Sequence, residues 1–341
     1  MRVFDKYLTL VVLVCMAIGV LIGQFIPVIP ETIIRFQVYE INLIIGILIW
    51  VMIYPMMLKI DFTSVKAVGK SPKGLYLTWV INWLIKPFTM FGIAALFFYV
   101  IFKNILPSDL ARDYLAGAVL LGAAPCTAMV FVWSQLTKGN PAYTLVQVAT
   151  NDLIILILFI PIVGLLLGLG GITIPWGTLI LSIVLFVVIP LLLASLTRHY
   201  VVKSKGLSYL NDVVIKKFNK ITMVGLLLTL VLIFSLESQL ILNNPLHILL
   251  IAIPLTIQTF LIFFIGYYGA YKLKLSHDVA GPAAMIGASN FFELAVAIAI
   301  IISPAVALAT IVGILVEVPL MLILVKIVNK TKYKFKEGAL A

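Results

Sequence analysis

The chain has 341 residues, of which 63% are hydrophobic and 11% charged, and its mean hydropathy is +1.20. Soluble domains carry about a quarter charged residues, so this composition predicts a polytopic membrane protein without a sizeable soluble domain. The net charge of +11 does not indicate nucleic-acid binding, because the basic residues lie in short loops between apolar segments. The two cysteines, Cys15 and Cys126, lie in separate apolar segments, which argues against a disulfide framework and excludes a site of three thiolates.

Ten apolar segments are each about 20 residues or longer, enough to cross the core of a bilayer. The first follows Arg2 and Lys6 and lacks a small-residue cleavage motif, so we expect a retained helix rather than a signal peptide. These segments predict an all-α membrane protein with ten transmembrane helices, which cover residues 7–27, 41–60, 75–101, 115–136, 144–170, 177–197, 221–242, 246–271, 279–302 and 304–328.

Lysine and arginine residues are distributed unevenly between the two sides of these spans. With a cytoplasmic N-terminus, twenty of them lie in cytoplasmic segments, and only Arg35, Lys103 and Arg112 lie outside. Such an excess is typical of cytoplasmic loops, so we expect both termini to be cytoplasmic. The basic stretch 198–220 is expected to be a loop that follows span six and connects the two halves.

Two of the predicted spans are interrupted. Span four contains Pro125, which has no N–H and clashes with the preceding turn, within the stretch Leu120–Val130. Span nine is interrupted 165 residues later, at Ile286–Glu293, by the polar pair Ser289-Asn290. Backbone groups freed at this depth must be buried in protein or line a cavity. Interrupted spans at corresponding positions of two halves are the best sequence indication of a transporter site.

The segments around the interruptions indicate an internal duplication. Leu121-Gly122-Ala123 aligns with Ile286-Gly287-Ala288, after which Pro141-Ala142 falls close to Pro304-Ala305, each opening the next span. Five spans per half is an odd number, so the halves must have opposite orientations. We therefore predict two inverted five-helix repeats, 1–174 and 175–341, with broken, crossing helices four and nine at a central site.

Polar residues within the spans are costly and are functional candidates by default. Glu293 is a candidate proton-binding carboxylate, and its alternative role is to bond freed backbone N–H groups. Cys126 could bind a soft, thiophilic element, or it could be a small inert core residue. Thr127 supplies a hydrogen-bonding group at the first interruption, and Ser289 and Asn290 do so at the second.

Other polar residues are expected to support these two interruptions. Asn151, Asp152 and Glu317 either line the cavity or brace the broken helices, and we favour bracing. Lys86 lies in the middle of span three and needs a partner, for which Asp152 or Glu317 is the best candidate, as a structural ion pair. Pro125 supports the site by breaking span four.

Motifs of other functional classes are absent from the sequence. There is no Gly-rich phosphate loop, which excludes ATP hydrolysis by this chain. Neither G-x-S-x-G nor H-E-x-x-H occurs, so an intramembrane hydrolase has little support. We therefore expect a secondary transporter rather than an enzyme, with no cofactor and no metal site, driven by an ion gradient or a partner.

The residues around both interruptions resemble those of a known family. Gly122–Ser134 is very similar to the fourth-span signature of the arsenite efflux permeases of arsenical-resistance operons, and Ala288–Ala295 resembles their ninth-span signature. The run Gly139–Tyr143 and the triplet Glu317-Val318-Pro319 also fit. The resemblance covers essentially the whole chain, and its strings are long and specific.

This resemblance implies membership of the bile acid:sodium symporter superfamily. The fold would have a core domain of spans 3–5 and 8–10 and a panel domain of spans 1, 2, 6 and 7. The function would be export of arsenite, in some members also antimonite, in exchange for protons across the plasma membrane, conferring arsenical resistance. The family's essential cysteine and glutamate map onto Cys126 and Glu293, and Thr127, Ser289 and Asn290 would contact the substrate hydroxyls.

Three alternatives remain open. A sodium-coupled symporter of organic anions shares the fold and would not require Cys126. A membrane receptor would bind ligand without moving it, and a passive arsenite channel would not depend on a pH gradient. The sequence is compatible with the presence or the absence of a cooperating ATPase subunit and sets no oligomeric state.

Overall fold

A computed structural model of the chain describes residues 2–38, 41–58, 72–126, 129–172, 176–243 and 245–335. These residues are almost entirely helical. The two strands among them are the two-residue antiparallel pair β1 (Gln37–Val38) and β2 (Ile41–Asn42). The chain forms two compact units from segments distant in sequence: unit 1 contains Met1–Thr9, Asp61–Ile174 and Leu246–Ala341, and unit 2 contains Leu10–Ile60 and Pro175–Pro245.

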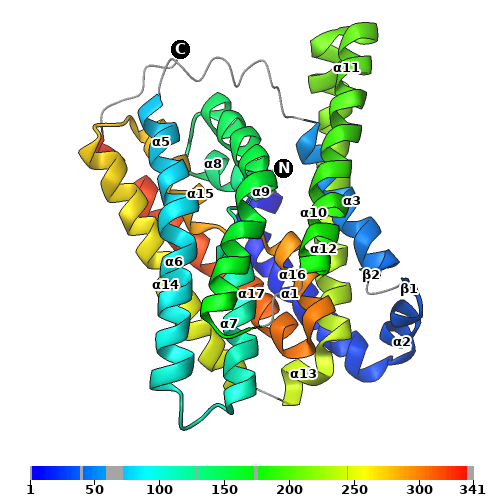
Figure 1. Ribbon diagram of the computed structural model, residues 1–341. Coiled ribbons are helices and arrows are strands. Elements are labelled where there is room, and N and C mark those ends of the chain that lie inside the picture. Colours follow the sequence, from blue (N-terminus) through cyan, green and yellow to red (C-terminus); the bar gives the residue numbers. More distant parts are fainter. Residues whose placement is uncertain are drawn as a thin grey trace. The chain divides into compact units, whose positions relative to one another are not determined.

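Unit 2 is built from helices at the start and in the middle of the chain (Figure 1). It contains most of α1 (Arg2–Phe25), followed by α2 (Val28–Arg35) and α3 (Leu43–Met57). After Pro175 its elements are α10 (Trp176–Ile183), η4 (Val184–Val188), α11 (Ile189–Tyr209), η5 (Leu210–Ile215), α12 (Lys216–Leu236) and α13 (Ser238–Asn243). The π turn η4 directly precedes Ile189-Pro190, and such a wider turn accommodates the hydrogen bond that a proline removes.

The basic stretch 198–220 was expected to be a loop, but it is helical on both sides of Gly206. It includes the second half of α11, all of η5 and the start of α12. The helix is interrupted at Gly206, whose φ of +83° and ψ of 166° are non-helical. Basic side chains are compatible with a helix that continues past the apolar segment, so composition marked the end of the span but not the end of the helix.

Unit 1 contains the elements in which the sequence placed the candidate site. Its first half comprises α5 (Pro72–Val80), η2 (Ile81–Ile85), α6 (Lys86–Ala95), η3 (Leu96–Ile101), α7 (Ser108–Gly122), α8 (Val130–Leu136) and α9 (Pro141–Leu169). Its second half comprises α14 (Pro245–Lys272), α15 (His277–Ala288), α16 (Phe292–Ile302), α17 (Pro304–Lys330) and the 3₁₀ turn η6 (Lys332–Lys334).

The long helices α9 and α17 begin at Pro141 and Pro304, as the sequence predicted. In α9 the side chain of Asn140 accepts hydrogen bonds from the backbone N–H groups of Ala142 and Tyr143. In α17 the side chain of Ser303 accepts one from Val306. A polar N-cap followed by proline at the first helical position is a favoured helix start, because the cap satisfies free N–H groups and proline needs none.

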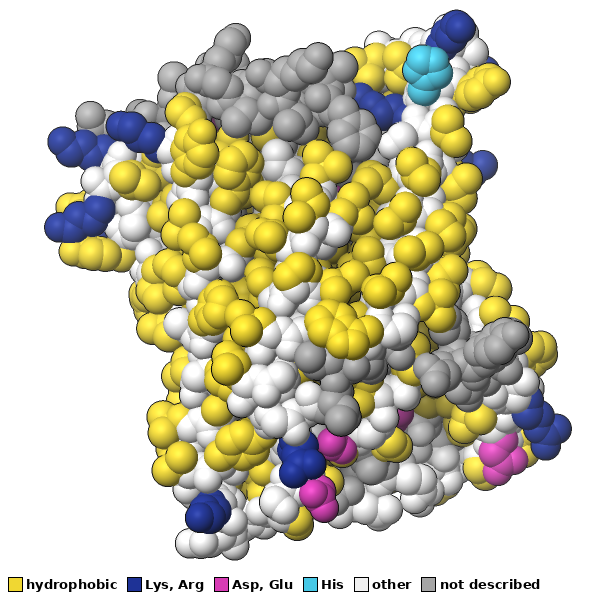
Figure 2. All heavy atoms as spheres, viewed as in Figure 1, with side chains coloured by type: hydrophobic (Ala, Val, Ile, Leu, Met, Phe, Trp, Pro, Cys, Tyr) yellow, Lys and Arg dark blue, Asp and Glu magenta, His cyan; other side chains and the backbone are white. Residues whose placement is uncertain are grey.

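The chain is a multi-pass membrane protein. Within the described ranges, five helices are long and apolar enough to cross a membrane, or six if the bent pair Leu10–Phe25 and Val28–Arg35, which meet at 93°, forms one span. Predicted spans four and nine are not among them, because each is divided into two shorter helices. Figure 2 shows hydrophobic side chains over most of the drawn face and charged side chains mainly towards its two ends.

Helices α7 and α17 pack closely, and this packing positions the first break. A Cβ atom added to Gly117 of α7 would lie 2.6 Å from the carbonyl oxygen of Val306 and from the Cβ of Ala309. Further along the same pair of helices, Gly313 of α17 packs against the Leu121 side chain of α7. Small residues let membrane helices approach each other closely. The resulting van der Waals contacts hold the helices together, because there is no hydrophobic driving force between helices within lipid.

Candidate functional site

The two breaks in unit 1 pair with each other. The first lies between α7, which ends at Gly122, and α8, which begins at Val130; the second lies between α15 and α16. Pro125 and Asn290 form an antiparallel bridge. The N–H of Cys126 donates to the carbonyl of Ser289 (3.3 Å), and the N–H of Phe291 donates to the carbonyl of Ala124 (3.2 Å). Each break thus satisfies backbone groups freed by the other, as burial in an apolar environment requires.

Lys86, at the start of α6, supplies a cation to backbone carbonyls of both breaks. Its Nζ donates to the carbonyl of Ser289 at 2.5 Å and to that of Ala124 at 3.5 Å, and its side chain is buried. A cation near C-terminal helix carbonyls is favourable, because these carry partial negative charge. No direct salt bridge joins Lys86 to Asp152 or Glu317 among the described residues. Glu317 nevertheless interacts with Lys86 electrostatically at longer range.

Glu317, in the middle of α17, accepts the donors of the second break. The Ser289 hydroxyl donates to its Oε1 at 2.5 Å, the Asn290 N–H donates at 3.1 Å, and the Asn290 side-chain amide donates to Oε2 at 3.2 Å. Charge-assisted hydrogen bonds of this kind are stronger than neutral ones. Glu317 therefore braces the break by hydrogen bonds. The Ser289 hydroxyl group and the Asn290 side-chain amide both donate to it.

Cys126 lies at the centre of the paired breaks and is buried, with 1% of its surface exposed. Its Sγ accepts a hydrogen bond from the N–H of Met129 at 3.3 Å. The carboxyl groups of Glu293 and Glu317 are close enough to interact with it electrostatically. The next residue, Thr127, lies outside the described residues. Cys15 belongs to α1, in the part of that helix assigned to unit 2.

Among the described residues of unit 1, two carboxyl groups are buried without a hydrogen-bond partner in another residue. Glu293 lies in the first turn of α16 with 2% of its surface exposed, and Asp152 lies in α9 with 1% exposed. A charged carboxylate in such surroundings is costly, and a proton removes that cost. Asp152 does not brace its neighbours by hydrogen bonds, contrary to the role preferred from the sequence.

Asn151 connects α9 to the π turn η2. Its side-chain oxygen accepts from the Trp83 indole at 2.9 Å and from the Asn82 amide at 3.2 Å. Its own amide donates to the carbonyl of Gln147 at 2.8 Å. Asn151 therefore holds the segment just before Lys86, and these contacts are to span three rather than to a broken helix.

Gln258 of α14 is a contributor that the sequence analysis missed. Its side-chain amide donates to the carbonyl of Lys86 at 3.0 Å and to the Thr89 hydroxyl at 2.9 Å. A glutamine inside the apolar span 246–271 was a visible signal, because polar groups in membrane helices need partners. Trp133, seven residues after Cys126, is fully buried, and its indole N–H has no partner among the described residues.

One crossing of broken helices therefore gathers a thiol, a carboxyl group and the amide oxygen Asn290 Oδ1. Neither the carboxyl group nor the amide oxygen has a hydrogen-bond partner in another described residue. The described part of the chain contains no group of three or more His, Cys, Asp and Glu side chains placed to hold a metal ion. A thiol can bind a soft element, and a buried carboxyl group can exchange a proton.

Comparisons with known proteins identify the family of the chain. Residues 46–244 match the Sodium Bile acid symporter family. The chain is 59% identical, over 98% of its length and 95% of the relative, to the Arsenical-resistance protein Acr3 of Alkaliphilus metalliredigens. It is 44% identical to the Uncharacterized transporter slr0944 of Synechocystis sp., with 98% and 91% of the two chains covered.

A more distant relative covers a similar length. The Arsenical-resistance protein Acr3 of Corynebacterium glutamicum is 28% identical over 94% of this chain and 87% of its own. The matched family is named for a symporter and the Synechocystis relative is named a transporter, so the chain is a transporter rather than an enzyme. The chain therefore belongs to the sodium–bile acid symporter family of membrane transporters.

Proposed function

We propose that the protein exports trivalent arsenic from the cytoplasm in exchange for protons and thereby confers arsenical resistance. The observation that carries this proposal is the crossing of the two breaks, which places the buried Cys126 thiol beside Ser289 and near Glu293. The 59% identity to an arsenical-resistance protein over nearly the whole chain supports the same substrate class.

Arsenite binding at Cys126 forms an As–S bond and an O–H bond of water, and it breaks the S–H bond and one As–O bond. Near neutral pH arsenite is mainly the uncharged As(OH)₃. The Cys126 sulfur bonds to arsenic, and one hydroxyl leaves as water with the thiol proton, so no electrons are transferred. Asn290 Oδ1, which has no partner, accepts a hydrogen bond from a remaining hydroxyl, and Ser289 and Thr127 contact the others. A single As–S bond is readily hydrolysed, which allows release.

Glu293 couples this binding to proton movement. An uncharged solute cannot use the membrane potential by itself, so uphill export requires coupling to an ion. Glu293 takes up a proton from outside, which loosens the site and favours release, and it loses the proton to the cytoplasm, which restores the site. Glu293 is buried without a hydrogen-bond partner in another described residue. This supports the role, because a charged carboxylate is costly in such surroundings and uptake of a proton removes that cost.

We further propose ten spans arranged as inverted repeats, 1–174 and 175–341. The matching starts of α9 and α17 after the two breaks support this. Spans 3–5 and 8–10 then form a core domain, and spans 1, 2, 6 and 7 form a panel domain. The division of the chain into units 1 and 2 along these segments supports that assignment.

The proposed location is the plasma membrane, with both termini in the cytoplasm. The uneven distribution of lysine and arginine supports this orientation. Antimonite has the same thiophilic chemistry as arsenite, and we propose it as a second substrate.

The test of coupling is arsenite accumulation in everted vesicles with and without an imposed pH gradient. Wild type should accumulate arsenite only with the gradient. Glu293→Gln cannot exchange a proton, so the gradient should not drive accumulation by this variant. Asp109→Asn, an exposed acid outside the site, serves as the matched control. Gradient-driven accumulation by Glu293→Gln would refute the coupling role.

The name of the matched family favours a second candidate, a sodium-coupled symporter of organic anions. It predicts uptake that depends on a sodium gradient and survives Cys126→Ser. Arsenite flux that requires the thiol excludes this candidate.

A further inference from the structure

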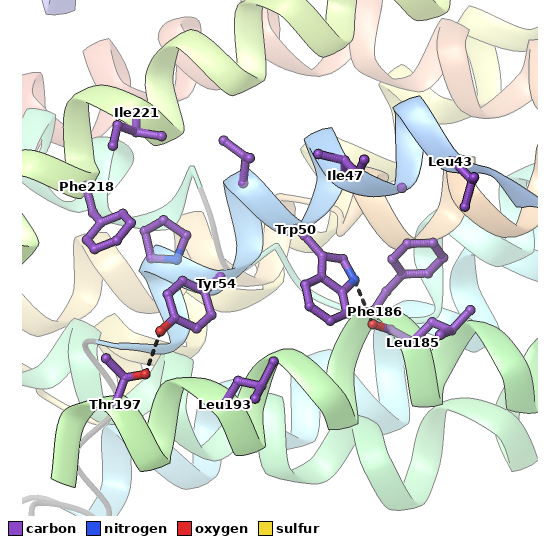
Figure 3. A pocket seen from close by; sticks show the side chains of 13 residues that line it. Leu43, Ile47, Trp50, Tyr54, Leu185, Phe186, Leu193, Thr197, Phe218 and Ile221 are labelled. Atoms are coloured by element: carbon purple, nitrogen blue, oxygen red, sulfur yellow. Dashed lines mark hydrogen bonds between the residues drawn. The ribbon is translucent and has the colours of Figure 1, made fainter. Parts of the chain in front are cut away.

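Unit 2 contains an apolar pocket of about 700 Å³ that the proposed transport site does not use (Figure 3). Its walls come from three parts of this unit. Helix α3 contributes Trp50 and Tyr54, the segment from η4 to α11 contributes Leu193 and Thr197, and α12 contributes Phe218. A volume of this size is typical of a small-molecule site.

The polar side chains that reach the pocket are paired with each other or with the backbone. The Trp50 indole donates to the carbonyl of Leu185 at 2.9 Å, and the Tyr54 hydroxyl donates to Thr197 Oγ1 at 2.7 Å (Figure 3). Other lining residues, such as Leu43 and Ile47, are aliphatic. A polar ligand would lose its bonds to water here without replacement, so the pocket suits a hydrocarbon.

The pocket is also elongated along the helices. Its lining extends over α3 from Leu43 to Pro55, a helical rise of about 18 Å. One leaflet of a bilayer contributes roughly 15 Å of hydrocarbon. The pocket therefore has the length of one lipid acyl chain.

One end of the pocket is basic. Arg198 directly follows the lining residue Thr197, and its guanidinium group donates to the carbonyl of Leu58 at 3.2 Å, so it bridges α11 and the end of α3. Lys217 directly precedes Phe218 and is exposed. Lys216 is paired with Asp212 at 2.9 Å. Both cations are thus chain neighbours of residues that line the end of the pocket formed by Tyr54, Thr197 and Phe218.

We propose that this pocket binds one acyl chain of an anionic phospholipid, with the phosphate headgroup at Arg198 and Lys217. The chain fills the space between α3, α11 and α12, and the headgroup complements the basic end. Basic residues next to a membrane attract anionic lipids in this way. The bound lipid is then a structural part of unit 2, separate from the arsenite site.

Trp50 allows a direct test, because bromine atoms on an acyl chain quench tryptophan fluorescence on contact. The full chain is reconstituted in phosphatidylcholine vesicles doped with dibrominated phosphatidylglycerol or dibrominated phosphatidylcholine. The Trp50 signal is the difference between wild type and Trp50→Phe. We expect half-maximal quenching at a roughly fivefold lower fraction of the anionic lipid. Equal quenching by both lipids, or no quenching of Trp50, overturns the proposal.

Two pairs of variants locate the lipid. Gly46→Leu fills the pocket and should abolish the Trp50 quenching. Gly92→Leu, in unit 1, where an added Cβ meets nothing within 4 Å, should not. Lys217→Gln should reduce the preference for the anionic lipid, whereas the exposed Lys272→Gln should leave it unchanged. If Gly46→Leu does not fold, the comparison of the two brominated lipids on wild type still tests whether an anionic lipid binds next to Trp50.

A second copy of the chain is the competing occupant. Ile47→Cys in a Cys15→Ser background reports on it, because a paired copy would give a disulfide-linked dimer. Dimer formation together with an unquenched Trp50 overturns the lipid proposal.

Discussion

The ammonium group of Lys86 donates a 2.5 Å hydrogen bond to the backbone carbonyl of Ser289, a residue 203 positions later in the chain. The hydroxyl group of the same serine donates to Glu317. One residue of the second break thus lies between a buried cation on α6 and a buried anion on α17. Carbonyls freed by the breaks bond to the cation and N–H groups bond to the anion, so the crossing is held by charges of both signs.

Replacement of Lys86 by methionine should destabilise the crossing. The carbonyl of Ala124 would then keep only its bond to Phe291, and that of Ser289 only its bond to Cys126. An under-satisfied buried group costs about 1–3 kcal/mol, so the melting temperature in detergent should fall and transport should be lost. Lys86→Arg should retain more stability, and the exposed Lys272→Met should behave as wild type. An unchanged melting temperature for Lys86→Met would contradict this role.

Glu317 and Glu293 should respond differently to the same conservative change. In Glu317→Gln one acceptor oxygen remains for the donors of Ser289 and Asn290, so transport should weaken while its dependence on the pH gradient persists. In Glu293→Gln the dependence itself should disappear. Initial rates of arsenite uptake into everted vesicles at several imposed gradients compare the two. The opposite pattern would exchange the two roles.

Gly117 should tolerate no side chain. Gly117→Ala places a Cβ 2.6 Å from the carbonyl oxygen of Val306, which forces α7 and α17 apart. Overpacking of this kind costs about 1–3 kcal/mol, and the melting temperature should fall accordingly. Gly92→Ala, in open space, provides the control and should be neutral. Equal melting temperatures for the two variants would show that α7 and α17 can separate without cost.

His277 should make the stability dependent on pH. It lies at the start of α15, before the predicted span, with Nε2 3.3 Å from the carbonyl of Val328. Burial lowers the pKa of its imidazole below the ordinary value of 6.5, and the charges of Lys332 and Lys138 also lower it. The hydrogen bond to the Val328 carbonyl and the charge of Asp278 act in the opposite direction. Just below pH 6.5 the unfolded chain therefore binds more protons than the folded one, and stability falls as the pH falls.

Melting temperatures measured between about pH 8 and pH 5 test this dependence. His277→Gln removes the titrating group and should flatten the curve. The exposed His199→Gln should leave it as in wild type. A slope in His277→Gln equal to that of wild type would assign the dependence to other groups.

The sequence predicted where the helices break but not how the breaks are satisfied. Pro125 and the pair Ser289-Asn290 predict interruptions, because proline lacks an N–H and polar residues are costly in lipid. The bridge between Pro125 and Asn290 could not be predicted, since a freed backbone group can bond to any buried partner within reach. That choice depends on packing between helices far apart in the chain.

The direct hydrogen-bond partners of Lys86 could not be predicted for a related reason. Opposite formal charges suggested a carboxylate, whereas the structure uses carbonyls with partial charge at helix ends. Gln258 carries no charge, so the positions of the ionisable residues give no indication of its role. The helical course of 198–220 was missed because basic composition identifies the side of the membrane, not the conformation of the chain.

The most direct test of the account is arsenite accumulation in everted vesicles under an imposed pH gradient, comparing Cys126→Ser with Cys15→Ser. The two variants remove the same atom from the two cysteines of the chain, one at the crossing in unit 1 and one in the part of α1 that belongs to unit 2. We predict that Cys126→Ser abolishes accumulation and that Cys15→Ser retains it. Undiminished accumulation by Cys126→Ser, with its gradient dependence intact, would contradict the account by removing the thiol from the transport site.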